Sequence, residues 1–238
     1  YHWAAILGGR FWGYLVAWLN LSGLVTVLAA INVGTVRFVD SLVGVKLDDP
    51  ITQALLVATI TLSQALINHR GIRITQALID FSGWWIVGVS IAVVALVMTL
   101  TPSFSITRAF TWANYSGLPE ESPVWPASDS MAWLAFMAAL LPAYTITGFD
   151  ASAHAAEETI NAAREVPKAM IRSVVVSGIA GWIMLGMIVC SVTDPLKIVE
   201  AAEGAFMMAL VQATGETIAL MLGWAIAVAQ YLCGLATV

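Results

Sequence analysis

The chain has 238 residues, of which 60% are apolar and only 11% are charged, and its mean hydropathy is +0.86. Soluble domains carry about 25% charged residues, so this composition excludes an ordinary soluble protein and indicates one that lies in a lipid bilayer. A net charge of −5 with only ten Lys and Arg residues argues against nucleic acid as a partner. The two cysteines, Cys190 and Cys233, stand in apolar runs and imply no disulfide framework.

Six apolar runs are long enough for membrane helices, which need about 20 mostly apolar residues each. We expect spans over residues 11–36, 51–68, 81–101, 130–156, 173–193 and 217–238, the fourth of them broken near 147–150. The predicted fold class is therefore an all-α polytopic membrane protein with one transmembrane domain and six transmembrane helices. Because the chain opens without a Met or a signal peptide and is still apolar at Val238, we expect a fragment of a longer protein.

Two longer connections separate these runs. Residues 101–129 are rich in Pro, Ser, Trp and acid, and residues 194–216 include a weakly amphipathic stretch, 205–213. We expect both at the membrane surface or outside it. With residue 1 in the cytoplasm, six of the ten basic residues fall on the cytoplasmic side, a mild positive-inside pattern. The sequence therefore predicts a multi-pass cell-membrane protein with residue 1 on the cytoplasmic side.

Residues 21–27 and residues 232–238 are identical at five of seven positions. One interpretation is chance, because short matches arise easily in so apolar a chain. The other is an internal repeat. In that case the first and last spans run in opposite directions through the bilayer, as inverted-repeat transporters require.

Asp150 is the acid that a membrane helix would least be expected to contain, because a carboxylate in hydrocarbon is costly unless it faces protein or water. Residues 140–149 before it are largely apolar, and small residues resume at 151–153. Pro142 and Gly148 weaken a regular helix here, and broken helices are tolerated at membrane depth where they line a cavity. The alternative is that the helix ends at Phe149 and Asp150 is an interfacial acid.

Other polar residues within the apolar runs have two interpretations. Asn20, Asn32 and Gln230 either make hydrogen bonds between helices or line a cavity. The spacing of His154 and the following acids is similar to that of some zinc peptidases, but the second His is missing. We therefore expect no metal site and no enzyme activity.

Residues 147–159, followed by residues 167–169, resemble the sixth helix and the following loop of amino acid permeases. The most similar pattern is that of the amino acid/choline transporter family, within the amino acid-polyamine-organocation (APC) superfamily. Residues 1–20 and 68–85 resemble the starts of that family's third and fifth helices. On this resemblance the chain corresponds to helices three to eight of a five-plus-five inverted-repeat transporter fold, and the repeated segments fall on helices three and eight, which are symmetry mates.

The resemblance implies a secondary active transporter, or permease, for amino acids or related small amines that works by alternating access. The substrate classes are amino acids, γ-aminobutyrate, polyamines and choline, and the partner medium is the lipid bilayer. No cofactor is implied other than a coupling ion, H+ or Na+. The alternative function is a membrane-embedded ligand-binding scaffold or sensor that does not transport.

The resemblance also assigns roles to individual residues. Substrate contacts are expected from Tyr144, Thr147, Gly148, Phe149 and Asn20, and proton coupling or attraction of a substrate amine from Asp150. The family's first helix, which supplies the other half of the substrate site, is not in this chain. No Lys stands in the third span to replace a sodium ion, so proton and sodium coupling both stay open.

Overall fold

The computed structural model describes residues 2–44, 47, 49–118, 127–149, 151–154, 156 and 159–238. All regular structure in these residues is helical, which confirms the predicted all-α class. The helices belong to two compact units, Tyr1–Val89 with Leu220–Val238 and Ser90–Ala219. Each unit is described by itself below.

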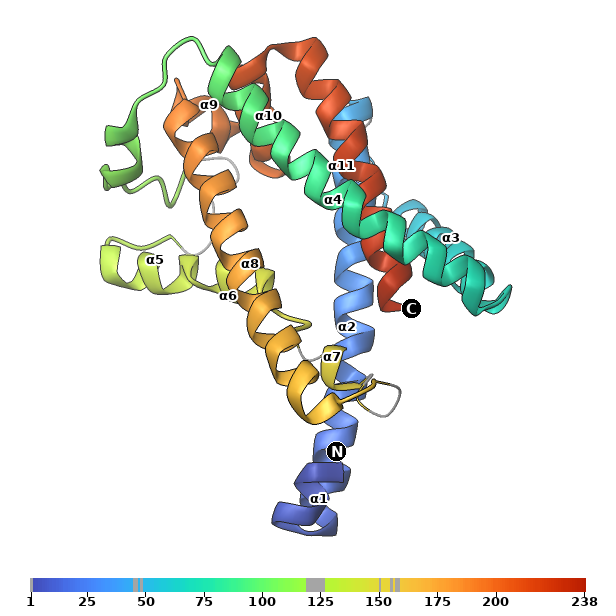
Figure 1. Cartoon of the computed structure of the whole chain (residues 1–238). Helices are drawn as coiled ribbons and strands as arrows, with labels where there is room; N and C mark the ends of the chain where they lie inside the picture. Colours follow the sequence, from blue (N-terminus) through green and yellow to red (C-terminus); the bar gives the residue numbers. More distant parts are fainter. Residues whose placement is uncertain are drawn as a thin grey trace. The chain divides into compact units, whose positions relative to one another are not determined.

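The first unit contains three complete helices and parts of two others (Figure 1). They are α1 (His2–Gly8), α2 (Arg10–Val43), α3 (Pro50–His69), and the portions of α4 (Ile72–Leu100) and α11 (Glu216–Thr237) that fall within it. Helix α2 ends where Gly44 adopts a left-handed conformation, with φ of 71°. Helix α3 begins where the Asp49 carboxylate accepts the N–H groups of Ile51 and Thr52, directly before Pro50.

Among the described residues, five helices are long and apolar enough to cross a membrane: α2, α3, α4, α8 (Ala162–Ser191) and α11. Each contains most or all of a predicted apolar run but extends past it. Helix α2, for example, has 34 residues, whereas the apolar run covers residues 11–36. The difference arises because a helix continues through polar residues until a cap ends it, while hydropathy marks only the part suited to lipid.

The fourth predicted span does not form one long helix. It is divided into α5 (Met131–Ala138), α6 (Leu140–Thr145) and α7 (Ala151–His154), and none of these is long enough to cross a bilayer. Pro142 gives the reason for the first division. Its ring has no N–H to donate to the Ala138 carbonyl and clashes with that carbonyl, so α5 ends at Ala138.

A cluster of polar side chains lies in the core of the first unit, where α2, α3 and α11 meet. Asn32 and Gln64 are completely buried. Asn32 Nδ2 donates to Thr61 Oγ1 at 2.8 Å and to Gln64 Oε1 at 2.9 Å. Gln64 Nε2 donates to Asn32 Oδ1 and to the Tyr231 carbonyl, both at 3.1 Å. For Asn32 the structure thus favours hydrogen bonding between helices over cavity lining.

The second unit is organised around α8. Its described elements are the remaining parts of α4 and α11, η1 (Ile106–Phe110), α5, α6, α7, α8, α9 (Pro195–Glu200), η3 (Ala202–Gly204) and α10 (Ala205–Thr214). Helix α8 contacts η1, α6, α7 and α10. The amphipathic stretch expected at 205–213 forms α10, whose inward face buries Met207, Leu210 and Ala213. These contacts make α8 the element against which the rest of the unit is positioned.

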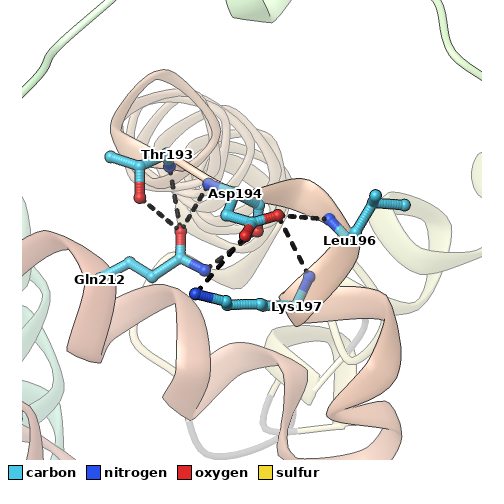
Figure 2. Close-up of polar contacts among 5 residues, drawn as sticks. All are labelled: Thr193, Asp194, Leu196, Lys197 and Gln212. Carbon is cyan, nitrogen blue, oxygen red and sulfur yellow. Dashed lines mark hydrogen bonds and ion pairs between the residues drawn. The ribbon is translucent and has the colours of Figure 1, made fainter.

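The C-terminal end of α8 is held by hydrogen bonds from two other segments. The Cys190 carbonyl, in the last turn, accepts the Ser105 N–H at 3.0 Å and the Arg108 guanidinium at 3.1 Å. Past the helix end, Gln212 Oε1 of α10 accepts the Thr193 and Asp194 N–H groups and the Thr193 hydroxyl, all at 3.0 Å (Figure 2). The first two bonds satisfy a carbonyl that the end of α8 leaves without a partner within the helix, and the bonds to Gln212 hold the segment that follows.

Candidate functional site

The chain leaves helical structure for a short segment between α6 and α7. Helix α6 ends at Thr145, and residues 146–149 form turns before α7 begins at Ala151. Within them, the Thr147 N–H donates to the Tyr144 carbonyl and the Ala151 N–H donates to the Gly148 carbonyl, both at 3.1 Å. Gly148 has φ of 84°, a left-handed conformation that glycine adopts without steric cost. The residue type at position 148 therefore matches the backbone that the interruption requires.

A pocket of about 160 Å³ opens beside this interruption, within the second unit. One wall is the end of α6 with the α6–α7 connection, and the other is the middle of α8, a helix that contacts both short helices. The lining residues are Thr145, Ile146, Thr147, Gly148, Phe149, Ser173 and Ser177. The pocket thus combines backbone at a helix break, an aromatic ring and four hydroxyl groups.

Three of those hydroxyls already use their hydrogen atoms within their own segment. The bonds are Thr145 Oγ1 to the Leu141 carbonyl at 3.0 Å, Thr147 Oγ1 to the Tyr144 carbonyl at 2.6 Å, and Ser173 Oγ to the Met170 carbonyl at 2.8 Å. A hydroxyl that donates its hydrogen still has lone pairs with which to accept one. Their oxygens are therefore suited to a ligand that donates N–H groups, as an ammonium does.

The structure brings together three of the residues singled out from the sequence. Thr147, Gly148 and Phe149 line the pocket. Tyr144 lies in the last turn of α6; its carbonyl accepts a hydrogen bond from the Thr147 hydroxyl, and the residue is 47% exposed. Asn20 is half-buried in α2. It belongs to the first unit, whereas Tyr144, Thr147, Gly148 and Phe149 belong to the second. Asp150, and Glu157 and Glu158 of the zinc-like spacing, lie outside the described residues.

Sequence reasoning missed the two serines that α8 contributes to the pocket. Ser173 and Ser177 are four residues apart, so they lie on the same face of the helix. That spacing within an otherwise apolar stretch was the signal that would have identified them. Which neighbour the face meets follows only from the contact of α8 with α6 and α7.

A larger pocket, of about 640 Å³, lies elsewhere in the second unit. Its walls are residues 112–116, α5, the start of α6 and Val199. No carboxylate or amine is among its lining residues, and most of them are apolar. The smaller pocket has no charged side chain in its lining either, but four of its seven lining residues carry hydroxyl groups and it lies at the helix break, so it offers more polar contacts for its size. Within the described part of the chain, no three His, Cys, Asp or Glu side chains are placed to hold a metal ion.

Sequence comparison tests the resemblance over the entire chain. The family model described as amino acid permease matches residues 1–238. This chain belongs to the amino acid permease family. Together with the long apolar helices, membership makes the protein a multi-pass membrane protein of a transporter family.

Curated relatives of this permease are similar over the same extent. The amino-acid permease BAT1 of Arabidopsis thaliana is 25% identical, and its homolog in Oryza sativa subsp. japonica is 26% identical; each match covers 100% of this chain and 49% of the relative. An uncharacterized amino-acid permease of Schizosaccharomyces pombe is 22% identical over 90% of this chain and 38% of its own length. The chain thus spans about half the length of the curated relatives that it matches. No solved structure matches it significantly.

Proposed function

We propose that this permease is a secondary active transporter that carries amino acids or related small amines by alternating access, driven by a cation gradient. The observation that carries the proposal is the pocket at the α6–α7 interruption. There, Gly148 in a left-handed conformation lets the backbone approach a ligand, and the hydroxyls of Thr145, Thr147 and Ser173 offer acceptors for an ammonium group. Family membership supports an amino acid as the substrate.

In this mechanism the broken segment has two roles. Its backbone and Thr147 bind the substrate, and Phe149 and Tyr144 cover the bound molecule as the site changes access. The resemblance implies a substrate contact for Asn20 as well, and Asp150 exchanges the coupling proton or attracts the substrate ammonium. We further propose that residue 1 lies on the cytoplasmic side of the cell membrane.

The test is uptake by the full-length protein reconstituted in liposomes. Labelled neutral amino acids, γ-aminobutyrate, polyamines and choline are supplied separately, under an imposed pH gradient and then under a sodium gradient. Saturable uptake of one class under one gradient is expected. Binding of a ligand without uptake under either gradient would replace the transporter with a scaffold or sensor.

Two variants connect transport to the pocket. An alanine in the left-handed region costs about 1–2 kcal/mol, so Gly148→Ala is expected to lower uptake about tenfold. Gly186→Ala is the matched control, because Gly186 is helical in α8 and an added Cβ there meets nothing within 4 Å. Asp150→Asn is expected to abolish uptake or to remove its dependence on pH. Unchanged uptake in both Gly148→Ala and Asp150→Asn would remove this segment from the transport site.

A further inference from the structure

The chain contains two sequons, Asn-x-Ser sequences of the kind that accept an N-linked oligosaccharide when x is not proline. One is Asn114-Tyr115-Ser116, in the segment that follows η1, and the other is Asn20-Leu21-Ser22, within α2. The sequon at Asn20 stands in the apolar run suited to the interior of a bilayer, where a glycosylating enzyme does not reach it. The sequon at Asn114 lies in a connection between helices and is the candidate for modification.

Asn114 is exposed, and its side chain forms a local turn with Ser116. Asn114 Oδ1 accepts the Ser116 N–H at 2.9 Å and the Ser116 hydroxyl at 2.7 Å. Asn114 Nδ2 donates to the Ser128 carbonyl at 2.8 Å. An amide nitrogen carries two hydrogens, so a sugar can take the place of one while the other keeps the bond to Ser128. The folded loop is therefore compatible with a glycan on Asn114.

The position of Asn114 along the chain gives an enzyme access to it. Helix α4 ends at Leu100, 14 residues before Asn114, and α5 begins at Met131, 17 residues after it. An extended chain of the shorter of these lengths reaches up to about 45 Å, which is well beyond the headgroup layer. Before it folds, the loop can therefore enter an active site that stands clear of the bilayer.

The loop also lies on the side of the membrane where N-glycosylation takes place. Helices α2, α3 and α4, which lie between residue 1 and Asn114, are each long and apolar enough to cross a membrane. An odd number of crossings puts the loop on the side opposite residue 1. With residue 1 in the cytoplasm, Asn114 faces the lumen of the endoplasmic reticulum during synthesis. In this respect the site depends on the proposed orientation.

We propose that Asn114 is an N-glycosylation site, modified when the chain is inserted into a eukaryotic secretory membrane. The sugar donor is an oligosaccharide carried on a polyprenyl diphosphate. A bond forms between Asn114 Nδ2 and C1 of the first sugar, and the bond between that C1 and the diphosphate oxygen breaks. The polyprenyl diphosphate leaves, and the amide loses one proton. The Ser116 hydroxyl is the group that the transferase recognises beside the acceptor.

Expression of the full-length protein in cultured mammalian cells tests the proposal. Gel mobility is compared before and after the membranes are treated with peptide-N-glycosidase F. The unchanged protein is expected to carry a glycan that is lost in both Asn114→Gln and Ser116→Ala. Ser116→Thr is expected to retain it, because threonine supplies the same hydroxyl. Ser22→Ala removes the sequon within α2 and is expected to leave the glycan unchanged.

A variant with an acceptor on the opposite side of the membrane separates the site from the orientation. Ala163→Thr places a hydroxyl two residues after the exposed Asn161, at the start of α8. The six predicted spans put this position in the cytoplasm, so Asn161 is expected to stay unmodified. Identical mobility of the unchanged protein and Asn114→Gln would overturn the proposal, even in a variant that folds poorly, because modification precedes folding. Modification of Asn161 in Ala163→Thr, with none at Asn114, would overturn the orientation as well, whereas uptake tests transport independently.

Discussion

The side-chain amides of Asn32 and Gln64 hydrogen-bond to each other in both directions across the contact between α2 and α3. The two distances are 2.9 Å and 3.1 Å, and both side chains are completely buried. An amide buried in an apolar helix bundle must find partners. Each of these residues supplies both a donor and an acceptor to the other, so the pair fixes the register between the two helices.

The Asn32–Gln64 pair is expected to be energetically coupled. Asn32→Ala or Gln64→Ala alone leaves a buried amide partly without partners, whereas the double substitution removes both. A double-mutant cycle, measured as the free energy of unfolding in micelles, is expected to give a coupling of about 0.5–2 kcal/mol. Additivity within about 0.3 kcal/mol would show that the pair contributes no more than its separate parts.

Gly234 of α11 is expected to be intolerant of a side chain. A Cβ at this position would collide with Gln64 Nε2 and lie 2.8 Å from Asn32 Oδ1. Gly234→Ala is therefore expected to lower the free energy of unfolding by about 1–3 kcal/mol. The control is its counterpart in the repeated segment, Gly23, where an added Cβ meets nothing within 4 Å. Gly23→Ala is expected to be neutral or stabilising by up to about 1 kcal/mol, and equal losses in both variants would contradict the packing argument.

The Gln212 side chain is expected to hold the segment between α8 and α9 in place. Gln212→Ala removes the acceptor of the Thr193 and Asp194 N–H groups and the donor to the Asp194 carbonyl. Losing these bonds costs roughly 1–3 kcal/mol locally. Hydrogen exchange at Thr193 and Asp194 is expected to accelerate about tenfold or more. Gln76→Ala, at an exposed position in α4, is the control, and unchanged exchange in Gln212→Ala would contradict the prediction.

The Asp49 cap of α3 is expected to contribute stability that disappears only in strong acid. The hydroxyl and N–H of Thr52 and the N–H of Ile51 hold the pKa of Asp49 below its usual value of 3.8. A carboxyl whose pKa is lower when folded stabilises fully above its usual value, and this stabilisation is lost as pH falls through the lower, folded value. The difference in melting temperature between the unchanged protein and Asp49→Asn should therefore be constant from neutral pH to about 4 and shrink below that.

Asp49→Ala separates the charge of this cap from its hydrogen bonds. Asparagine still accepts the N–H groups of the first turn, whereas alanine does not. At neutral pH, Asp49→Ala is expected to melt at a lower temperature than Asp49→Asn. If the two variants melt together, and both keep their difference from the unchanged protein at pH 2, the carboxylate is not the cap.

Hydropathy predicted the long helices because a bilayer imposes the same length and composition on every span. It could not give their ends. Asp49 decides the start of α3 through the hydrogen bonds of its carboxylate, and Gly44 decides the end of α2 through its left-handed backbone, so both helices extend beyond their apolar runs. It also treated residues 130–156 as one broken span, whereas Pro142 adds a further division between α5 and α6.

By itself, the sequence determined the all-α membrane class, the resemblance to the permeases and the segment around Gly148 as the candidate site. Each of these depends on local composition or on a contiguous motif. Only the tertiary structure decided which face of each helix meets which neighbour. It brought Ser173 and Ser177 to the pocket beside Gly148 and paired Asn32 with Gln64. In lipid, apolar side chains gain little from one helix neighbour over another, so the pairing depends on a few polar bonds and close contacts between residues far apart in the chain.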